Sequence, residues 1–281
     1  MSSYCYLDGT IVAGEEARLP VTDLGLQRGF GIFDFMRTYN DRLFHPGDHL
    51  RRFRASASEL SLHVPLSDER LLEIGNELLS RSSLDYPALK FILTGGDGTP
   101  ESPLAKPRLI IIALNRPVFP DHLYQRGAHL LSVRFSRELP HVKTLNYLNS
   151  LRLNRWKQEH GALDLLYYDT EHGVTESPQA NVFMANHEQN KLITPSEGIL
   201  KGITRQIVIE LARPYYEVQI RPITLDEFSQ CDECFICSTS KRIIPVTSLD
   251  TRNIGSGHAG LITKHVMQLF DYYTARYSAS Q

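Results

Sequence analysis

The longest apolar runs of this chain are only as long as a β-strand, far shorter than a membrane-spanning helix. Leu109–Leu114 is one such run. A helix needs about 20 predominantly apolar residues to cross a bilayer, so the sequence predicts no membrane-spanning helix. The 281 residues, 42% of them hydrophobic, are enough for a large core in two domains or in one big domain.

Strand patterns occur in both halves, and helical patterns fall irregularly between them. The N-terminal half predicts a hairpin at Asp8-Gly9, a helix capped by Asp48, a second helix starting at Ser67, and strands at 89–93 and 109–114. The C-terminal half predicts strands at 128–135, 163–169 and 181–185, and helices at about 146–159, 205–212 and 259–276. This irregular order favours an α+β fold over a doubly wound parallel sheet. No Gly-x-Gly-x-x-Gly follows a predicted strand, which argues against a dinucleotide site.

The proline-containing stretch after Asn115 is the best domain boundary, because it has little periodicity. We therefore expect a small N-terminal domain over residues 1–117, a linker over 118–124, and a large C-terminal domain over 125–281.

Charge and cysteine content narrow the class of protein. The chain has 30 Lys and Arg residues and 32 Asp and Glu residues, which gives a net charge of −2. Proteins that bind duplex nucleic acid usually carry an excess of basic residues instead. The N-terminus has no basic and apolar signal-peptide pattern, and four cysteines give no disulfide framework. Cys231, Cys234 and Cys237 lack the second ligand pair that zinc needs, so no metal is expected. We expect a cytoplasmic protein that binds neither nucleic acid nor membrane.

Lys143 stands where an apolar helical pattern begins, a poor place for a solvated lysine. Burial would lower its pKa and make the neutral amine available for a Schiff base. The alternative is a lysine that extends from a loop edge to solvent.

Glu176 lies between a turn and a β-rich apolar segment, where an unpaired carboxylate would be costly. A protonated pyridine nitrogen would be a fitting partner, since the carboxylate keeps the ring an electron sink. The alternative is a glutamate on a surface loop.

Three further features could bind a phosphate group. Gly202, Ile203 and Thr204 open a predicted helix, whose N-terminus offers free N–H groups. Arg52 could bind phosphate through two donors, and Thr239 lies in a hydroxyl-rich segment. A self-capped helix and a solvated arginine are the alternatives.

Taken together, these residues resemble a known family. The segments that carry the resemblance span nearly the whole chain, in the family's order and spacing: Arg28–Arg37, His49–Arg52, Lys143–Tyr147, Glu176–Phe183, Leu200–Arg205, Ser238–Ser240 and Pro245-Val246. This set resembles the class IV (fold-type IV) pyridoxal-phosphate-dependent aminotransferases, which include D-amino acid and branched-chain aminotransferases and aminodeoxychorismate lyase.

The resemblance implies a fold and a set of roles. It implies a small N-terminal α/β domain and a larger C-terminal pseudo-barrel domain, with the cofactor pyridoxal 5'-phosphate (PLP) bound between them. It also implies that two copies of the chain form a homodimer. Lys143 would hold the cofactor and move the proton between Cα and C4′. Glu176 would bind the ring nitrogen of the cofactor, and Leu200 would pack on the ring. The phosphate would be held by Arg52, Ile203, Thr204 and Thr239. Phe33 replaces a tyrosine common in relatives, and Tyr147 would supply a hydroxyl near the cofactor.

The substrates implied are an amino acid and a 2-oxo acid, and the carboxylate-binding residue decides which amino acid. The Arg-x-His pair of well-known D-amino acid transaminases is absent after the strand at 89–93. Lys90 and Arg28 are the candidate cations, although Lys90 could equally point outward from the sheet. The Arg28–Asp34 segment is similar to a less common subgroup of D-amino acid transaminases, so we expect D-amino acid transamination. L-branched-chain aminotransfer, aminodeoxychorismate lyase and a cofactor-free binding protein are the rival functions.

Overall fold

The computed structural model describes residues 3–97 and 106–278. The chain forms two compact units. Unit 1 comprises the described residues of Met1–Arg116, Val142–Asn146 and Tyr277–Gln281, and unit 2 those of Pro117–His141 and Tyr147–Arg276. The short segment that carries Lys143 is therefore part of unit 1, far along the chain from the rest of that unit.

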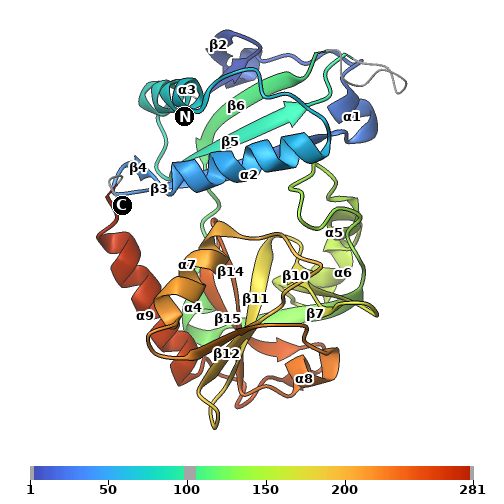
Figure 1. Ribbon diagram of the computed structural model, residues 1–281, viewed down its shortest axis with the longest axis vertical. Coiled ribbons are helices and arrows are strands. Elements are labelled where there is room, and N and C mark those ends of the chain that lie inside the picture. Colours follow the sequence, from blue (N-terminus) through green and yellow to red (C-terminus); the bar gives the residue numbers. More distant parts are fainter. Residues whose placement is uncertain (1–2, 98–105, 279–281) are drawn as a thin grey trace. The chain divides into compact units, whose positions relative to one another are not determined.

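Unit 1 contains an antiparallel sheet with helices packed against it (Figure 1). The strand order is β2-β1-β6-β5-β3-β4. The strands are β1 (Tyr4–Leu7), β2 (Thr10–Ala13), β3 (Gly31–Tyr39), β4 (Arg42–Leu43), β5 (Pro87–Thr94) and β6 (Arg108–Asn115). The helices are η1 (Gly14–Glu16), α1 (Leu24–Arg28), α2 (Pro46–Glu59) and α3 (Asp68–Arg81). The hairpin predicted at Asp8-Gly9 is confirmed, since β1 pairs with β2.

The two long helices of unit 1 begin differently. Ser67 caps α3 as predicted, because its side chain accepts a hydrogen bond from the Arg70 N–H. The predicted cap at Asp48 is wrong. The helix α2 begins two residues earlier at Pro46, after His45 in a left-handed conformation, and Asp48 lies in its first turn. Proline is well suited to a first helical turn because its φ is preset and its missing N–H is not needed there.

Side chains alternate across β3, so its two faces differ. Asp34 and Met36 are buried, whereas Phe33 and Phe35 are half-buried. The edge of β3 also receives the segment 142–146, which runs antiparallel to it. Ile32 bridges Thr144, and the Leu145 N–H donates to the Gly31 carbonyl over 3.0 Å.

Unit 2 is organised around a mixed sheet of order β13-β12-β11-β14-β15-β7-β8-β9. Its strands are β7 (Ala128–Arg134), β8 (Asp164–Asp169), β9 (Gly173–Val174), β10 (Glu176–Ser177), β11 (Ala180–Asn186), β12 (Lys191–Thr194), β13 (Glu217–Ile220), β14 (Glu233–Ser238), β15 (Arg242–Leu249) and β16 (Arg252–Asn253). β10 pairs with β11, and β16 pairs with β15. Apolar side chains of the long strands form its core, in which Phe183 stacks on Phe235 with ring centroids 4.9 Å apart.

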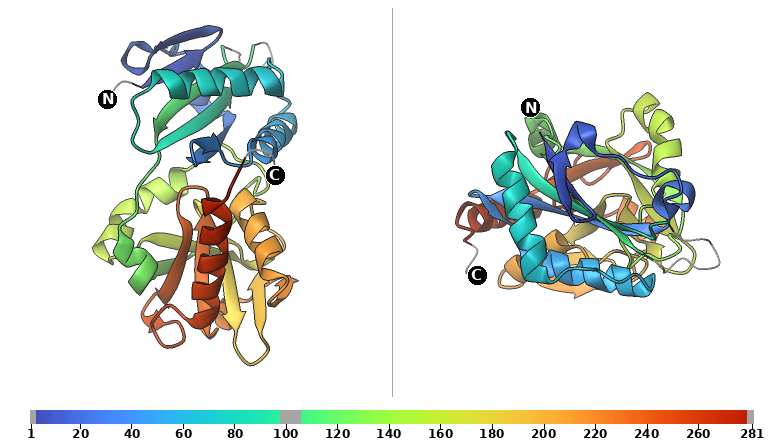
Figure 2. Two further views of the ribbon diagram at one scale, coloured as in Figure 1. Left: turned by 90° about the vertical axis from the view of Figure 1, so that its left-hand side faces the viewer. Right: turned by 90° about the horizontal axis from the view of Figure 1, so that it is seen from above.

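The helices of unit 2 pack around this sheet, and α9 lies against α7 and β14 (Figure 2). They are α4 (Asp121–Arg126), α5 (Leu148–Arg152), α6 (Asn154–Glu159), α7 (Ile203–Ala212), α8 (Leu225–Ser229) and α9 (Leu261–Ala275). The segment 118–124, expected as a linker, contains the start of α4. No helix in the described part of the chain combines the length and apolarity needed to span a membrane.

The single helix predicted at about 146–159 is wrong, because two short helices occupy this stretch. The chain leaves helical geometry at Leu153, between α5 and α6. Leu148 and Leu151, which supplied the helical periodicity, are 71% and 69% exposed. Their spacing therefore does not mark a face buried within unit 2.

Candidate active site

Lys143 is held by its backbone on two sides. Its carbonyl accepts a hydrogen bond from the Phe33 N–H over 2.9 Å, and its N–H donates to Ser56 Oγ on α2 over 3.3 Å. A residue fixed in this way presents its side chain from a defined point of the sheet edge, as a catalytic amine requires.

Two amines lie against the ring of Phe33. Lys143 Nζ is 4.7 Å from the ring centroid, and Lys90 Nζ is 4.9 Å from it. Lys90 lies opposite Phe35 in the β3–β5 register. Burial lowers the pKa of Lys90. The structure thus brings three predicted site residues together and places an apolar ring where a tyrosine would offer a hydroxyl.

Arg52 is anchored by a buried carboxylate. Its Nε and Nη2 atoms each lie 2.8 Å from an oxygen of Asp34, and His49 Nδ1 lies 2.6 Å from Asp34 Oδ1. Burial raises the pKa of Asp34, but the charge of Arg52 and the hydrogen bonds from Arg52 and His49 outweigh it and hold that pKa well below its usual range. These contacts use Nε and Nη2 of the guanidinium, and the N–H groups of Nη1 remain suited to an anion such as phosphate.

Glu176 is buried and hydrogen-bonded, not on a surface loop. Arg137 Nη1 donates to its Oε1 over 2.5 Å. Its Oε2 accepts from the Leu200 N–H over 2.9 Å and from Asn181 Nδ2 over 3.3 Å. The carboxylate therefore has a compensating cation, and each carboxylate oxygen can accept more than one hydrogen bond, as it would from a pyridine N–H.

The N-terminus of α7 has no side-chain cap. Gly202 is the cap residue, and Ile203 and Thr204, both buried, open the helix. A Cβ on Gly202 would lie 2.0 Å from Asn181 Oδ1, so a side chain there would displace the Asn181 amide or the helix start. The first N–H groups of this ten-residue helix are therefore not occupied by a capping side chain, which suits an anion.

The other predicted residues of unit 2 lie at the ends of elements. Thr239 is in the turn between β14 and β15, and Leu200 is buried just before α7. Tyr147 is half-buried and precedes α5. The Leu200 N–H donates to Glu176 Oε2 over 2.9 Å.

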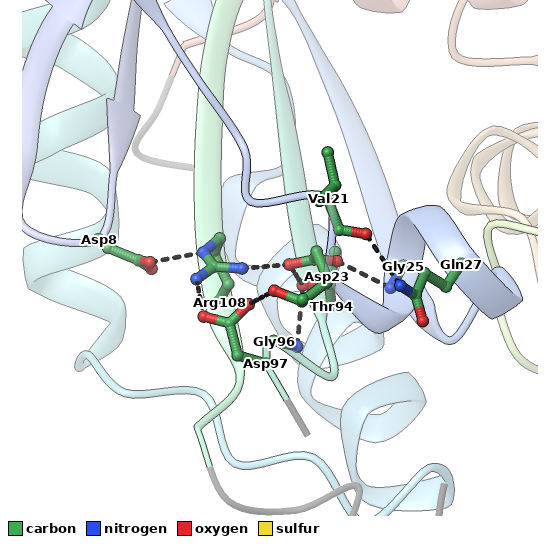
Figure 3. A network of polar contacts seen from close by, with 10 residues as sticks. Asp8, Val21, Asp23, Gly25, Gln27, Thr94, Gly96, Asp97 and Arg108 are labelled. Atoms are coloured by element: carbon green, nitrogen blue, oxygen red, sulfur yellow. Dashed lines mark hydrogen bonds and ion pairs between the residues drawn. The ribbon is translucent and has the colours of Figure 1, made fainter. Parts of the chain in front are cut away.

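Arg28 is the last residue of α1, and its side chain is exposed. The start of α1 is strongly anchored (Figure 3). Asp23 is fully buried, its Oδ1 accepts from the Gly25 N–H over 2.8 Å, and its Oδ2 pairs with Arg108. Arg108 also binds Asp8 and Asp97. Just beyond Asp97, the stretch 98–102, over which the Arg-x-His pair is absent, lies outside the described residues.

Sequence reasoning missed two residues that complete these sites. Arg137 lies six residues before Lys143 and pairs with Glu176. Asp34 is a charged residue inside an apolar strand pattern, which was the signal that it needed a buried partner. Within the described residues no group of three or more His, Cys, Asp and Glu could hold a metal, and all four cysteines are free.

The residues of both units fit the groups of PLP. A positioned amine suits its aldehyde, a buried and paired carboxylate suits its pyridine nitrogen, and an uncapped helix N-terminus suits its phosphate. Bound there, PLP supplies an electron sink for amino-group transfer.

Comparison with known proteins bears on the fold and the family. A crystal structure of the T.th. branched-chain amino acid aminotransferase with pyridoxamine 5'-phosphate superposes with a TM-score of 0.90 at 25% identity, over 100% of this chain and 96% of that one. A Methanocaldococcus jannaschii protein named "Putative branched-chain-amino-acid aminotransferase" is 31% identical over 274 residues, 94% of each chain. The D-alanine aminotransferase of Staphylococcus aureus strain N315 is 28% identical, over 97% of this chain and 98% of that one.

The fold and these similarities define the class of protein as a PLP-dependent transaminase of fold-type IV, with the α+β fold predicted from the sequence. Residues 31–249 match the family described as Amino-transferase class IV. The chain belongs to this family of class IV aminotransferases, so the expected family, fold, enzyme class and cofactor are confirmed.

Proposed function

We propose that this aminotransferase moves an amino group between a D-amino acid and a 2-oxo acid. Lys143 would bond to the cofactor and carry the proton between the substrate Cα and the cofactor. Glu176 would hold the pyridine nitrogen beside Leu200, and the phosphate would bind Arg52, Thr239 and the α7 N-terminus at Ile203 and Thr204. Tyr147 would add a hydroxyl near the cofactor.

The observation that carries the proposal is the pair of amines on Phe33. Lys143 must lose its proton to act as a base, whereas a carboxylate-binding lysine must keep its charge. Lys90 would take the second role, and a bound carboxylate would raise the pKa that burial lowers. Arg28 is a second cation for the same carboxylate.

The position of this cation determines which enantiomer reacts. For a substrate whose Cα hydrogen faced Lys143, exchanging the places of carboxylate and side chain would convert one enantiomer into the other. The similarity of Arg28–Asp34 to a D-amino acid transaminase subgroup supports the D-enantiomer, as does the D-alanine aminotransferase among the relatives.

L-branched-chain aminotransfer is the second candidate. The Methanocaldococcus jannaschii relative and the superposed structure both carry branched-chain names, which favours it. A screen of D- and L-amino donors against pyruvate and 2-oxoglutarate separates the two. We expect turnover of D-alanine or D-glutamate; turnover of L-leucine or L-valine alone would overturn the D-amino acid proposal.

We also propose that the enzyme acts as a homodimer in the cytoplasm. Exposed apolar side chains in both units support an assembled state, including Val21 (76% exposed), Leu26 (66%) and Leu148 (71%). Light scattering after size-exclusion chromatography tests the assembly, and a monomer at micromolar concentration would contradict it.

A further inference from the structure

Unit 2 contains a buried ion pair that the proposed chemistry does not use. Lys241 is 3% exposed, and its Nζ lies 3.2 Å from Oδ2 of Asp164, which is 4% exposed and begins β8. The other Asp164 oxygen accepts the Leu165 N–H over 2.9 Å. Desolvation offsets most of the attraction within a buried pair, so stability alone does not account for it.

Lys241 ends the turn that joins β14 to β15, and its backbone is held as well as its side chain. The Tyr124 hydroxyl donates to the Lys241 carbonyl over 3.1 Å, and the Lys241 N–H donates to Ser238 Oγ over 3.2 Å. The next residue, Arg242, has a φ of +58°, a left-handed conformation that costs energy for a residue other than glycine. The turn is therefore fixed in one conformation at its C-terminal end.

This turn also presents three consecutive hydroxyl groups. Ser238 Oγ and Ser240 Oγ lie 3.4 Å apart, and Thr239 is between them in the sequence. A hydroxyl group binds phosphate only at hydrogen-bond distance and with good alignment. Phosphate binding by these side chains therefore depends on the conformation of the turn backbone that carries them.

We propose that the Lys241–Asp164 ion pair positions the β14–β15 turn so that Thr239 can bind the cofactor phosphate. Lys241 is a positioning residue, since its ammonium is directed at Asp164 and tethers the turn to β8. This inference rests on the proposed role of Thr239. It adds that phosphate binding also depends on the Lys241–Asp164 ion pair, which does not itself bind the phosphate.

Cofactor analogues with and without phosphate test the proposal. The cofactor is removed from the wild-type enzyme and from Lys241→Met, and each is titrated with PLP and with pyridoxal while the absorbance of the lysine-bound aldehyde is followed. Loss of a well-placed hydrogen bond to a charged group corresponds to about a 10- to 100-fold loss of affinity. We expect Lys241→Met to lose PLP affinity by about that factor and to keep pyridoxal affinity within about twofold.

Four further variants separate positioning from general damage. The Lys241→Met/Asp164→Leu variant removes both charges, avoids an unpaired buried carboxylate, and should show the same selective loss. Thr239→Val should lose PLP affinity selectively, and Lys241→Arg should recover part of it. Lys191→Met, which removes another lysine of unit 2 from its pairing with Glu217, is the matched control and should bind both analogues like wild type.

Equal losses of affinity for PLP and pyridoxal would overturn the inference. So would unchanged PLP affinity in both Lys241→Met and Lys241→Met/Asp164→Leu. A wild-type enzyme that binds PLP no better than pyridoxal would instead contradict the proposed phosphate site itself. The two failures are therefore distinguishable in the same titration.

Discussion

At the scale of single residues, burial decides which charged groups can do chemistry. Glu176 and Asp34 are buried carboxylates, and each has an arginine within hydrogen-bond distance. Lys90 has a half-buried side chain whose amine lies against an aromatic ring. A charge removed from water needs a partner, and in an enzyme that partner can be the substrate.

Lys90 gives the first prediction. Lys90→Met should raise the KM for the amino donor by about 10- to 100-fold, because a hydrogen bond between charged groups is lost. Since burial lowers the pKa of Lys90, donor binding by the wild type should weaken at alkaline pH, and Lys90→Arg should extend it to higher pH. Steady-state kinetics across alkaline pH measure both effects. An unchanged KM in Lys90→Met would leave Arg28 as the carboxylate-binding residue.

His49 gives a prediction about stability and pH. Burial lowers its pKa against the opposing effect of Asp34, with Arg52 and Lys143 contributing, so the folded protein keeps the ring neutral. The unfolded chain then binds the extra proton as the pH falls below about 6.5, and the free energy of unfolding should fall with it. Urea unfolding between about pH 7 and pH 5 measures the slope, which should be smaller in His49→Gln. An equal slope in that variant would show that His49 is not responsible.

At the scale of elements, the start of α7 depends on the absence of one methyl group. In Gly202→Ala, the new Cβ would lie 2.0 Å from Asn181 Oδ1, so the helix start or the Asn181 side chain beside it must move. We expect PLP affinity to fall about tenfold or more, because the first N–H groups no longer align with the phosphate. Titration of the cofactor-free enzyme measures it.

A matched control is available at the first turn of α2. A Cβ on Gly47 would meet nothing within 4 Å, so Gly47→Ala should leave cofactor affinity unchanged. Equal effects of the two substitutions would mean that cofactor binding does not depend on the start of α7.

At the scale of the whole molecule, the proposed cofactor ligands are divided between the two units. Lys143 and Arg52 belong to unit 1, and Glu176 and Thr239 belong to unit 2. A ligand that binds only the folded state stabilises it by about 2.7 kcal/mol at a concentration of 100 times Kd. We therefore expect PLP to raise the Tm of the enzyme.

Differential scanning calorimetry of the enzyme with and without cofactor measures this stabilisation. Lys143→Ala with PLP should resemble the cofactor-free enzyme. The same Tm in all three samples would contradict the stabilisation.

The sequence by itself predicted several of the strands and the residues with distinctive chemistry. Alternating and continuous apolar runs located β5 and β6, since strand burial follows local spacing. Lys143 and Glu176 could be selected because a charged group in an apolar context is costly wherever the chain goes. The same reasoning failed at 146–159, where Leu148 and Leu151 have helical spacing but are exposed in unit 2.

Only the tertiary structure decided which partners these residues have. The segment at 142–146 joins a strand far earlier in the chain, so that Lys143 and Lys90 meet on Phe33. The pairing of Arg137 with Glu176 and that of Lys241 with Asp164 also join residues that are well separated in the sequence. Local spacing encodes which face a side chain occupies, whereas hydrogen bonds and ion pairs depend on distances that exist only after the sheets have formed.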